Sequence, residues 1–473
     1  MRKYAIITTW LIGFFAVVTS MQMQGCANIV PPSGGPRDSL PPYLVVAKPK
    51  DSSLNIQPKE IVIAFNEFIT TESIQENLII SPGIKTTPLI DARLNMLRIR
   101  INDTLDKNTT YSVKFGNAIK DVNEGNILKN FTYVFSTGNY LDSGRLSGNV
   151  RIAETGSIDS TLIVVLHPTN KDSAIYKDKP LYYSKVDAKG KFEFTFLPAA
   201  AFSVFVLPND YNKRYDDSTK LFGFLNTPLQ ITAQTDSQQL YVFQAHQKVE
   251  KKKASTAANN KNVKKVPAVL KYMKSIEGNE QDLLTDLTLT FETPVQFNDS
   301  FPIVLCDTLN RPLSNYTVSI DTATKKLVTI HYDWIESTPM RLIVPKRSIL
   351  DTNQNYIAKA DTIKFITKSD AAYGSALVRV SGYQSMRHPI LLLTKDNKVA
   401  YSYPIKQSLI PMLKLPPGDY DLKVLDDTNN NGIWDTGKYN NSIKQQPEIV
   451  KKLTDILNIK SNWENEVNVI INK

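Results

Sequence analysis

Two patterns of apolar–polar alternation, each present twice, constrain the fold of this chain more than any other feature. In the stretch IVIAFNEFI at 61–69, apolar side chains fall on every second residue near its start, and TTYSVKF at 109–115 ends with the same spacing. Clusters of Asn, Asp, Gly and Pro separate such stretches between residues 43 and 138. Short runs that alternate in this way and end at turn residues predict antiparallel strands packed as a sandwich.

The same pattern returns in the second half of the chain. LTLTFETPV at 287–295 matches IVIAFNEFI, and IKFITKSD at 363–370 matches YVFSTGNY at 133–140. A second pattern opens with DSGRLSGNV at 142–150 and again with GSALVRVSG at 374–382. Because each copy of a repeat forms one structural unit, the sequence predicts an all-β chain of four tandem antiparallel β-sandwiches with very little helix.

Changes in composition mark the boundaries of these units. Pro and Gly dominate the segment before the first sandwich, and residues 248–265 hold seven Lys and one Glu among Ala and Asn. Neither segment can bury a core, so both are expected to be connectors. The predicted divisions are a signal peptide (1–25), a tether (26–42), a first sandwich (43–138), a second (144–245), a basic linker (246–266), a third (267–369) and a fourth (374–473).

The first 26 residues predict export and an anchor. Arg2 and Lys3 precede the apolar run YAIITTWLIGFFAVV at 4–18, and Cys26 closes the segment. A basic start, a short apolar core and a small residue before the cut are typical of a secretory signal, and the run is short for a membrane span. Gly25-Cys26 resembles the lipobox of bacterial lipoproteins, although the residues at 23 and 24 (Met and Gln) depart from the usual pattern.

This resemblance implies a diacyl or triacyl lipid on Cys26 and attachment to membrane lipid. Two alternatives stay open: a secreted protein with an incidental Cys, and an uncleaved membrane anchor. The only other Cys is Cys306, so lipidation of Cys26 leaves no disulfide, and each sandwich must be held by its own core. Cys306 lies in the apolar stretch FPIVLCD and is expected to be a buried, unreactive thiol.

The net charge of +10 is concentrated outside the predicted sandwiches. The Lys-rich stretch at 248–265 and the basic start of the signal peptide account for most of it. Nearly neutral sandwiches lack the basic stripe that nucleic-acid binding needs, so no nucleic-acid partner is expected.

The quoted motifs resemble two known domain families. IVIAFNEFI, TTYSVKFGNAIKDVNEGN and FTYVFSTG resemble the bacterial Ig-like domain of S-layer-associated and Bacteroidetes surface proteins, which implies Ig-like folds for 43–138 and 267–369. The turn at 186–190, followed by alternating Phe192, Phe194 and Phe196, and the related stretch LKLPPGDYDLKVLDDTNNNGIWDTG at 413–437 resemble the transthyretin-like, or carboxypeptidase-regulatory-like, sandwich. That resemblance implies this fold for 144–245 and 374–473, and modules without chemistry of their own.

The loop DTNNNGIWD at 427–435 is the sharpest local motif. Its spacing matches a calcium loop, in which alternate oxygen-bearing side chains converge on the ion; the candidate ligands are Asp427, Asn429, Asn431 and Asp435. Lys438 stands where a bidentate Glu is expected, so any Ca²⁺ affinity should be weak, about 10⁻⁴–10⁻³ M. The alternative is a hairpin loop whose side chains cap its own backbone. The corresponding loop at 208–216 begins with Pro and is expected to be metal-free.

No catalytic motif accompanies these features, so we expect a protein that is not an enzyme. None of the four His lies in an HExxH arrangement or beside a GxSxG turn, and the sequence has no glycine-rich phosphate loop. Two aromatic pairs are candidates for a sugar-binding platform, although alternate aromatics in sandwiches more often cover a core: Tyr332 with Trp334, and Tyr401 with Tyr403.

Together these features predict an outer-membrane lipoprotein that acts by binding or scaffolding. The expected partner is another envelope protein, such as an outer-membrane complex in which this chain is an accessory subunit. A surface glycan-binding protein is the alternative. The tether has no acidic cluster after Cys26, and the sequence does not assign the anchor to the periplasmic or the cell-surface leaflet.

Overall fold

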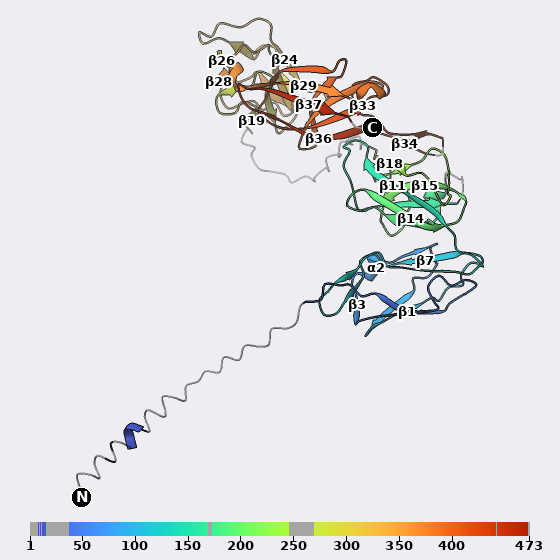
Figure 1. Cartoon of the computed structure of the whole chain (residues 1–473). Coiled ribbons are helices and arrows are strands. Elements are labelled where there is room, and N and C mark those ends of the chain that lie inside the picture. The colour runs from blue at the N-terminus through green and yellow to red at the C-terminus, as the bar shows by residue number, and fades with distance from the viewer. Residues whose placement is uncertain are drawn as a thin grey trace, which may run out of the picture. The chain divides into compact units, whose positions relative to one another are not determined.

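The structure is a computed structural model (Figure 1), and it describes Thr8, Trp10 and residues 12–15, 37–168, 173–245, 269–440 and 442–471. Strands dominate these ranges and form mostly antiparallel sheets, so the predicted fold class of tandem β-sandwiches is confirmed. Within the same ranges, no helix is long and apolar enough to cross a membrane.

Four groups of strands, called sandwiches 1 to 4 below, follow one another along the chain. Sandwich 1 contains β1(Leu44–Lys48), β2(Glu60–Phe65), β3(Ile69–Thr71), α2(Ile74–Asn77), β4(Ile79–Ser81), β5(Leu89–Arg93), β6(Met96–Arg100), β7(Thr110–Lys114), β8(Ile119–Asp121), β9(Ile127–Leu128) and β10(Thr132–Ser136). Sandwich 2 contains β11(Gly144–Ile152), β12(Leu162–His167), α3(Ala174–Lys177), β13(Tyr182–Lys185), β14(Lys191–Leu197), β15(Ala201–Pro208), β16(Gly223–Phe224), β17(Leu229–Gln230) and β18(Gln238–Val242).

Sandwich 3 contains β19(Tyr272–Lys274), β20(Glu280–Gln281), β21(Leu287–Phe291), β22(Val295–Phe297), β23(Val304–Cys306), β24(Thr317–Ile320), β25(Leu327–His331), β26(Pro339–Val344), β27(Ile349–Asp351) and β28(Asp361–Thr367). Sandwich 4 contains η1(Asp370–Ala372), β29(Gly374–Ser381), η2(Tyr383–Ser385), β30(Pro389–Lys395), β31(Lys398–Pro404), β32(Leu409–Leu415), β33(Gly418–Asp426), β34(Lys438–Tyr439), β35(Lys444–Gln445), β36(Ile449–Ile459) and β37(Glu464–Ile470). Two compact units result: one holds sandwich 1, and the other holds sandwiches 2, 3 and 4 apart from residues 196–198.

Strand order repeats along the chain. The orders β1-β2-β6-β5 and β10-β7-β4 of sandwich 1 correspond to β19-β21-β25-β24 and β28-β26-β23 of sandwich 3. The order β14-β11-β18 of sandwich 2 corresponds to β32-β29-β37 of sandwich 4, and in both the first and last strands of the sandwich are parallel neighbours. The two sequence patterns therefore correspond to two strand topologies, each present twice.

The alternating apolar residues form the cores. Ile61, Ile63 and Phe65 are at most 1% exposed, as alternation along β2 requires when one face of the sheet is covered. Phe192 and Phe194 of β14 are likewise buried, but Phe196 is not. Its φ of +59° turns the strand, so Leu197 is buried in its place and the predicted alternation ends two residues early.

Candidate functional site

Sandwiches 2 and 4 share a buried aromatic cluster. Tyr439 of β34 is 8% exposed, and its ring centroid lies 4.7 Å from that of Phe224, 5.1 Å from that of Phe222 and 5.8 Å from that of Phe205. The Tyr176 hydroxyl also donates a hydrogen bond of 3.3 Å to the carbonyl oxygen of Tyr439. A side chain of sandwich 4 is thus part of the core of sandwich 2.

Hydrogen bonds to main-chain carbonyl groups extend this joint. The Val450 N–H donates to the Ala153 carbonyl oxygen at 2.8 Å, which ties the start of β36 to the turn after β11. The Thr436 hydroxyl donates to the Gln244 carbonyl oxygen, also at 2.8 Å. Polar and apolar contacts together fix residues 436–450 on sandwich 2.

The loop at 427–435 leads into the joint, and its predicted ligands cap the loop itself. The Asp427 side chain is buried; its Oδ1 accepts from the N–H of Asn430 at 2.6 Å, and its Oδ2 accepts from the N–H of Gly432 at 2.8 Å. Asp435 Oδ2 accepts from the Nδ2 atoms of Asn429 and Asn431 at 2.5 and 2.7 Å. The Asp427 bonds cap the backbone of the loop, as in the capped-loop alternative, whereas the Asp435 bonds join side chains of the loop to one another.

A calcium ion would need a different set of atoms in this loop. Ca²⁺ takes oxygen ligands, whereas the amide nitrogens of Asn429 and Asn431 face Asp435 here, so both amides would have to turn over. In the described ranges, no group of three or more His, Cys, Asp or Glu side chains is placed to hold a metal ion. Calcium binding at Asp427, Asn429, Asn431 and Asp435 stays a prediction.

Glu448 connects this loop to the joint. Its side chain is 5% exposed; Oε1 accepts from the N–H and hydroxyl of Thr428 at 2.7 and 2.9 Å, and Oε2 accepts from the N–H of Asp435 at 3.0 Å. The indole N–H of Trp434 donates to the Glu448 carbonyl oxygen at 2.8 Å. The loop and the segment 446–449 therefore form one hydrogen-bonded piece. No local motif in the sequence marks Glu448, because its partners lie 13 and 20 residues away.

A groove opens where segment 222–226 separates from β18. Phe222 and Phe243 exchange two N–H···O=C bonds of 2.7 and 2.8 Å as an antiparallel bridge. In a continued ladder, Phe224 would exchange bonds with Tyr241 in the same way. Instead the Phe224 carbonyl oxygen accepts from Gln446 Nε2 of sandwich 4 at 2.9 Å. The ladder stops there, and a cavity of about 380 Å³ lies between the two segments.

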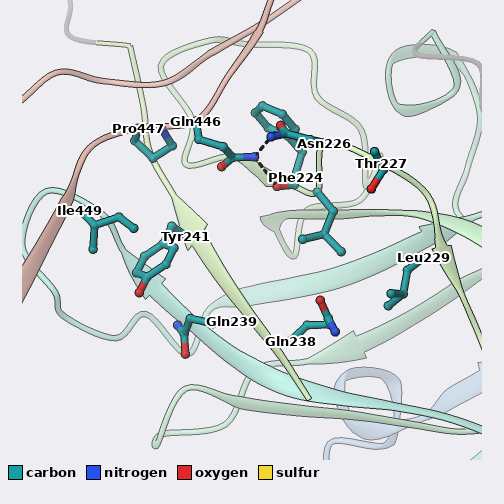
Figure 2. A pocket seen from close by; sticks show the side chains of 11 residues that line it. Phe224, Asn226, Thr227, Leu229, Gln238, Gln239, Tyr241, Gln446, Pro447 and Ile449 are labelled. Carbon is teal, nitrogen blue, oxygen red and sulfur yellow. Dashed lines mark hydrogen bonds between the residues drawn. The ribbon is translucent and has the colours of Figure 1, made fainter. Parts of the chain in front are cut away.

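Figure 2 shows the groove with side chains converging from three segments. Gln446 reaches across its upper side and also donates to Asn226 Oδ1 at 3.1 Å. None of the eleven lining residues is charged, and four carry carboxamides; the lining consists of Phe224, Leu225, Asn226, Thr227, Leu229, Gln238, Gln239, Tyr241, Gln446, Pro447 and Ile449. Burial raises the pKa of the Tyr241 phenol above its ordinary value, so this group also stays neutral.

β18 borders the groove with main-chain groups as well. The Val242 carbonyl oxygen accepts from the Ala153 N–H, so Val242 faces β11. Alternate residues of a parallel strand bond to the same neighbour, so Gln239 directs its N–H and C=O groups, and Tyr241 its N–H group, to the groove side. The Tyr241 carbonyl oxygen is covered by Gly223, where an added Cβ atom would lie 2.6 Å from it. Among the described strands, β18 ends its sheet on this side.

The aromatic pairs named from the sequence cover cores. The rings of Tyr332 and Trp334 lie 5.3 Å apart, and both pack against the core of sandwich 3. The Trp334 indole N–H donates to the Thr285 carbonyl oxygen at 3.0 Å. Tyr401 and Tyr403 pack in the same way against the core of sandwich 4. All four rings are half-buried, and sugar binding by either pair stays a prediction.

The remaining predicted features divide into two groups. Residues 26–36 of the tether, including Cys26, and the linker at 246–266 lie outside the described residues, as does the signal peptide at 1–25 apart from Thr8, Trp10 and residues 12–15. Cys306 is completely buried as predicted, and burial raises the pKa of its thiol. A thiol that is both buried and protonated is a poor nucleophile.

Comparison with known proteins assigns one domain. Residues 38–137 match a family model described as a bacterial Ig-like domain, and the match spans sandwich 1. The chain is thus an all-β protein of tandem β-sandwiches that contains a bacterial Ig-like domain. A search of curated proteins finds no match.

Three solved structures match this chain distantly. The Bacillus anthracis TIE protein is 13% identical, with 93% of this chain and 76% of that chain covered and a TM-score of 0.17. The major pilin subunit BcpA of Bacillus cereus is 10% identical, with 70% and 99% covered and a TM-score of 0.17. The S-layer protein SbsC is 10% identical, with 91% and 54% covered and a TM-score of 0.15. At these scores the matches establish neither a shared overall arrangement nor a function.

Proposed function

We propose that this chain is a lipid-anchored binding or scaffolding protein of the bacterial outer membrane, and an accessory subunit of an envelope protein complex. In this proposal Cys26 carries the lipid, and the Pro/Gly tether separates the first sandwich from the membrane. The sandwiches bind a protein partner and carry out no reaction.

The observation that carries the proposal is the joint between sandwiches 2 and 4. A buried aromatic side chain shared by the two sandwiches, with hydrogen bonds around it, joins them into one rigid unit. Directly beside the joint, a groove offers carboxamides and the edge of a sheet. A rigid support that presents a sheet edge suits a binding protein.

Fractionation of the native host tests the anchor and the partner together. A tagged full-length chain should sediment with membranes and co-purify from detergent-solubilised envelope with one membrane protein at constant stoichiometry. Cys26→Ala should move the chain to the soluble fraction, whereas Cys306→Ala, the matched change at the buried thiol, should leave it with the membranes. Membrane retention of Cys26→Ala, or the lack of a stoichiometric partner, would contradict the proposal.

A glycan-binding surface protein is the second candidate, and the lining of the groove favours it. Carboxamides both donate to and accept from sugar hydroxyls, and Tyr241 adds an aromatic ring. Retention on neutral polysaccharide columns that Gln239→Ala removes would support this candidate. Retention that Trp334→Ala removes would place the sugar on sandwich 3 instead.

A further inference from the structure

We propose that the groove between β18 and residues 446–449 is a docking site for an extended, uncharged peptide segment of a partner protein, which adds to sandwich 2 as a further strand. This inference rests on the proposed function in one respect, namely that the partner is a protein. It assigns the binding of that protein to the groove beside β18, by addition of a strand.

The edge of β18 supplies the ladder for such a strand. Gln239 directs its N–H and C=O groups, and Tyr241 its N–H group, to the groove side, and the described strands place no hydrogen-bond partner beside these three groups. The Tyr241 carbonyl oxygen lies against Gly223 and is not available. These three groups make a short ladder, which calls for a segment of about three to five residues. Main-chain bonds of this kind provide affinity with little demand on the sequence of the added strand.

Sandwich 4 keeps this edge from being covered by the chain itself. Segment 222–226 is bonded through Phe222 to Phe243, the residue that follows β18, and from there would continue along β18 as a ladder. Gln446 holds the segment away through its bonds to the Phe224 carbonyl oxygen and to Asn226 Oδ1. Gln446 is in turn placed by Glu448, which is fixed to the loop at 427–435. The open groove is therefore a product of the joint between the two sandwiches.

The lining selects the chemistry of the segment. Because none of the eleven lining residues is charged, a charged side chain entering the groove would lose hydration without gaining an ion pair. Carboxamides, by contrast, pair with peptide groups as both donors and acceptors. Two of the four, Gln238 and Gln239, lie on β18, and Asn226 and Gln446 lie across from it (Figure 2). An uncharged, extended peptide satisfies these groups and the strand edge together.

A peptide library with a matched pair of variants tests the inference. The purified full-length chain is used to select binders from a phage-displayed library of random heptapeptides, and selected peptides are then titrated against wild type, Gln239→Pro and Gln239→Ala. Proline removes the N–H that faces the groove and is tolerated at sheet edges, whereas alanine removes only the carboxamide. We expect uncharged peptides whose affinity falls about tenfold or more in Gln239→Pro and less than about threefold in Gln239→Ala.

Amide hydrogen exchange gives a second readout that needs no variant. In wild type with a selected peptide bound, exchange of the Gln239 and Tyr241 N–H groups should slow. If Gln239→Pro does not fold, this result alone tests whether the peptide binds at the edge of β18. Equal binding by Gln239→Pro and wild type, protection confined to other strands, or failure to select any peptide would overturn the inference. A neutral sugar whose binding is lost in Gln239→Ala but kept in Gln239→Pro would also overturn it, in favour of a glycan site.

Failure here is distinguishable from failure of the proposed function. If the envelope partner co-purifies equally well with Gln239→Pro and with wild type, the partner docks elsewhere and only the groove inference is lost. If no partner co-purifies but peptides bind as expected, the groove inference stands and the envelope role is lost.

Discussion

Replacing Tyr439 by Ala should uncouple sandwich 4 from sandwich 2. The Tyr439 side chain is 8% exposed and lies among the rings of Phe205, Phe222 and Phe224, which belong to the other sandwich. Truncating a buried large aromatic to Ala typically costs about 3–5 kcal/mol, through lost burial and the cavity left behind. Because these contacts cross the joint, the loss should fall on the coupling between the sandwiches as well as on sandwich 2.

Denaturant unfolding followed by two probes measures this effect. In a background in which Trp10, Trp334 and Trp463 are replaced by Phe, fluorescence of Trp434, which packs in the same cluster, reports on the joint. Circular dichroism reports on the strands as a whole. In wild type the joint and sandwich 2 should unfold in one transition; in Tyr439→Ala the fluorescence change should move to lower urea by an amount equivalent to about 3–5 kcal/mol. Hydrogen exchange at Phe222 and Phe243 should speed up accordingly.

Tyr211→Ala is the matched control. It removes the same side chain from sandwich 2 at a position that is 88% exposed, so the free energy of unfolding should change by less than about 0.5 kcal/mol. If Tyr439→Ala costs no more than Tyr211→Ala, or leaves the fluorescence transition in place, the aromatic cluster does not hold the two sandwiches together.

Three further predictions follow from single contacts. Gly437→Ala should destabilise the joint by about 1–3 kcal/mol in the same urea assay, because a Cβ atom there would lie 2.6 Å from the ring of Phe243; unchanged stability would mean that the hairpin can move aside. His167 is 2% exposed, and burial lowers its pKa below the ordinary 6.5. The unfolded chain therefore takes up a proton that the folded chain resists, so the free energy of unfolding should fall as the pH drops from 7 to 5. His167→Leu should flatten this slope, and an equal slope in both proteins would refute the assignment. If the loop at 427–435 binds Ca²⁺, millimolar Ca²⁺ should raise the melting temperature of wild type but not of Asp427→Ala; no rise in wild type would leave the loop as a capped turn.

The strands and cores were accessible from the sequence because they depend on local spacing. Alternation placed Ile61, Ile63 and Phe65 in a core, where they lie. Alternation failed at Phe196, where a positive φ turns the strand and no residue type announces it. At 187–190 the predicted turn is present, with the Asp187 N–H bonded to the Lys191 carbonyl oxygen. The flanking β13 and β14, however, belong to different sheets and do not form a hairpin.

The candidate site was not accessible in the same way, because distant segments build it. Gln446 and Phe224 are 222 residues apart, and no spacing rule connects a glutamine in one repeat with a carbonyl group in another. The Asp427 motif showed the opposite difficulty, because its residues were found by their spacing but Asp427, Asn429 and Asn431 also accept bonds from backbone N–H groups of the loop. Spacing alone therefore identified the loop and left its chemistry open.

The parallel pairing of first and last strands has a mechanical consequence. The chain enters sandwich 2 through β11 and leaves through β18, and these strands are parallel neighbours, as are β29 and β37 in sandwich 4. A pull on both ends of such a module drags the two strands past each other in opposite directions. The load then falls on all rungs of the ladder simultaneously, in shear, and the bonds cannot open one after another like a zipper. The strand arrangement of sandwiches 2 and 4 therefore suits them to resist tension along the chain.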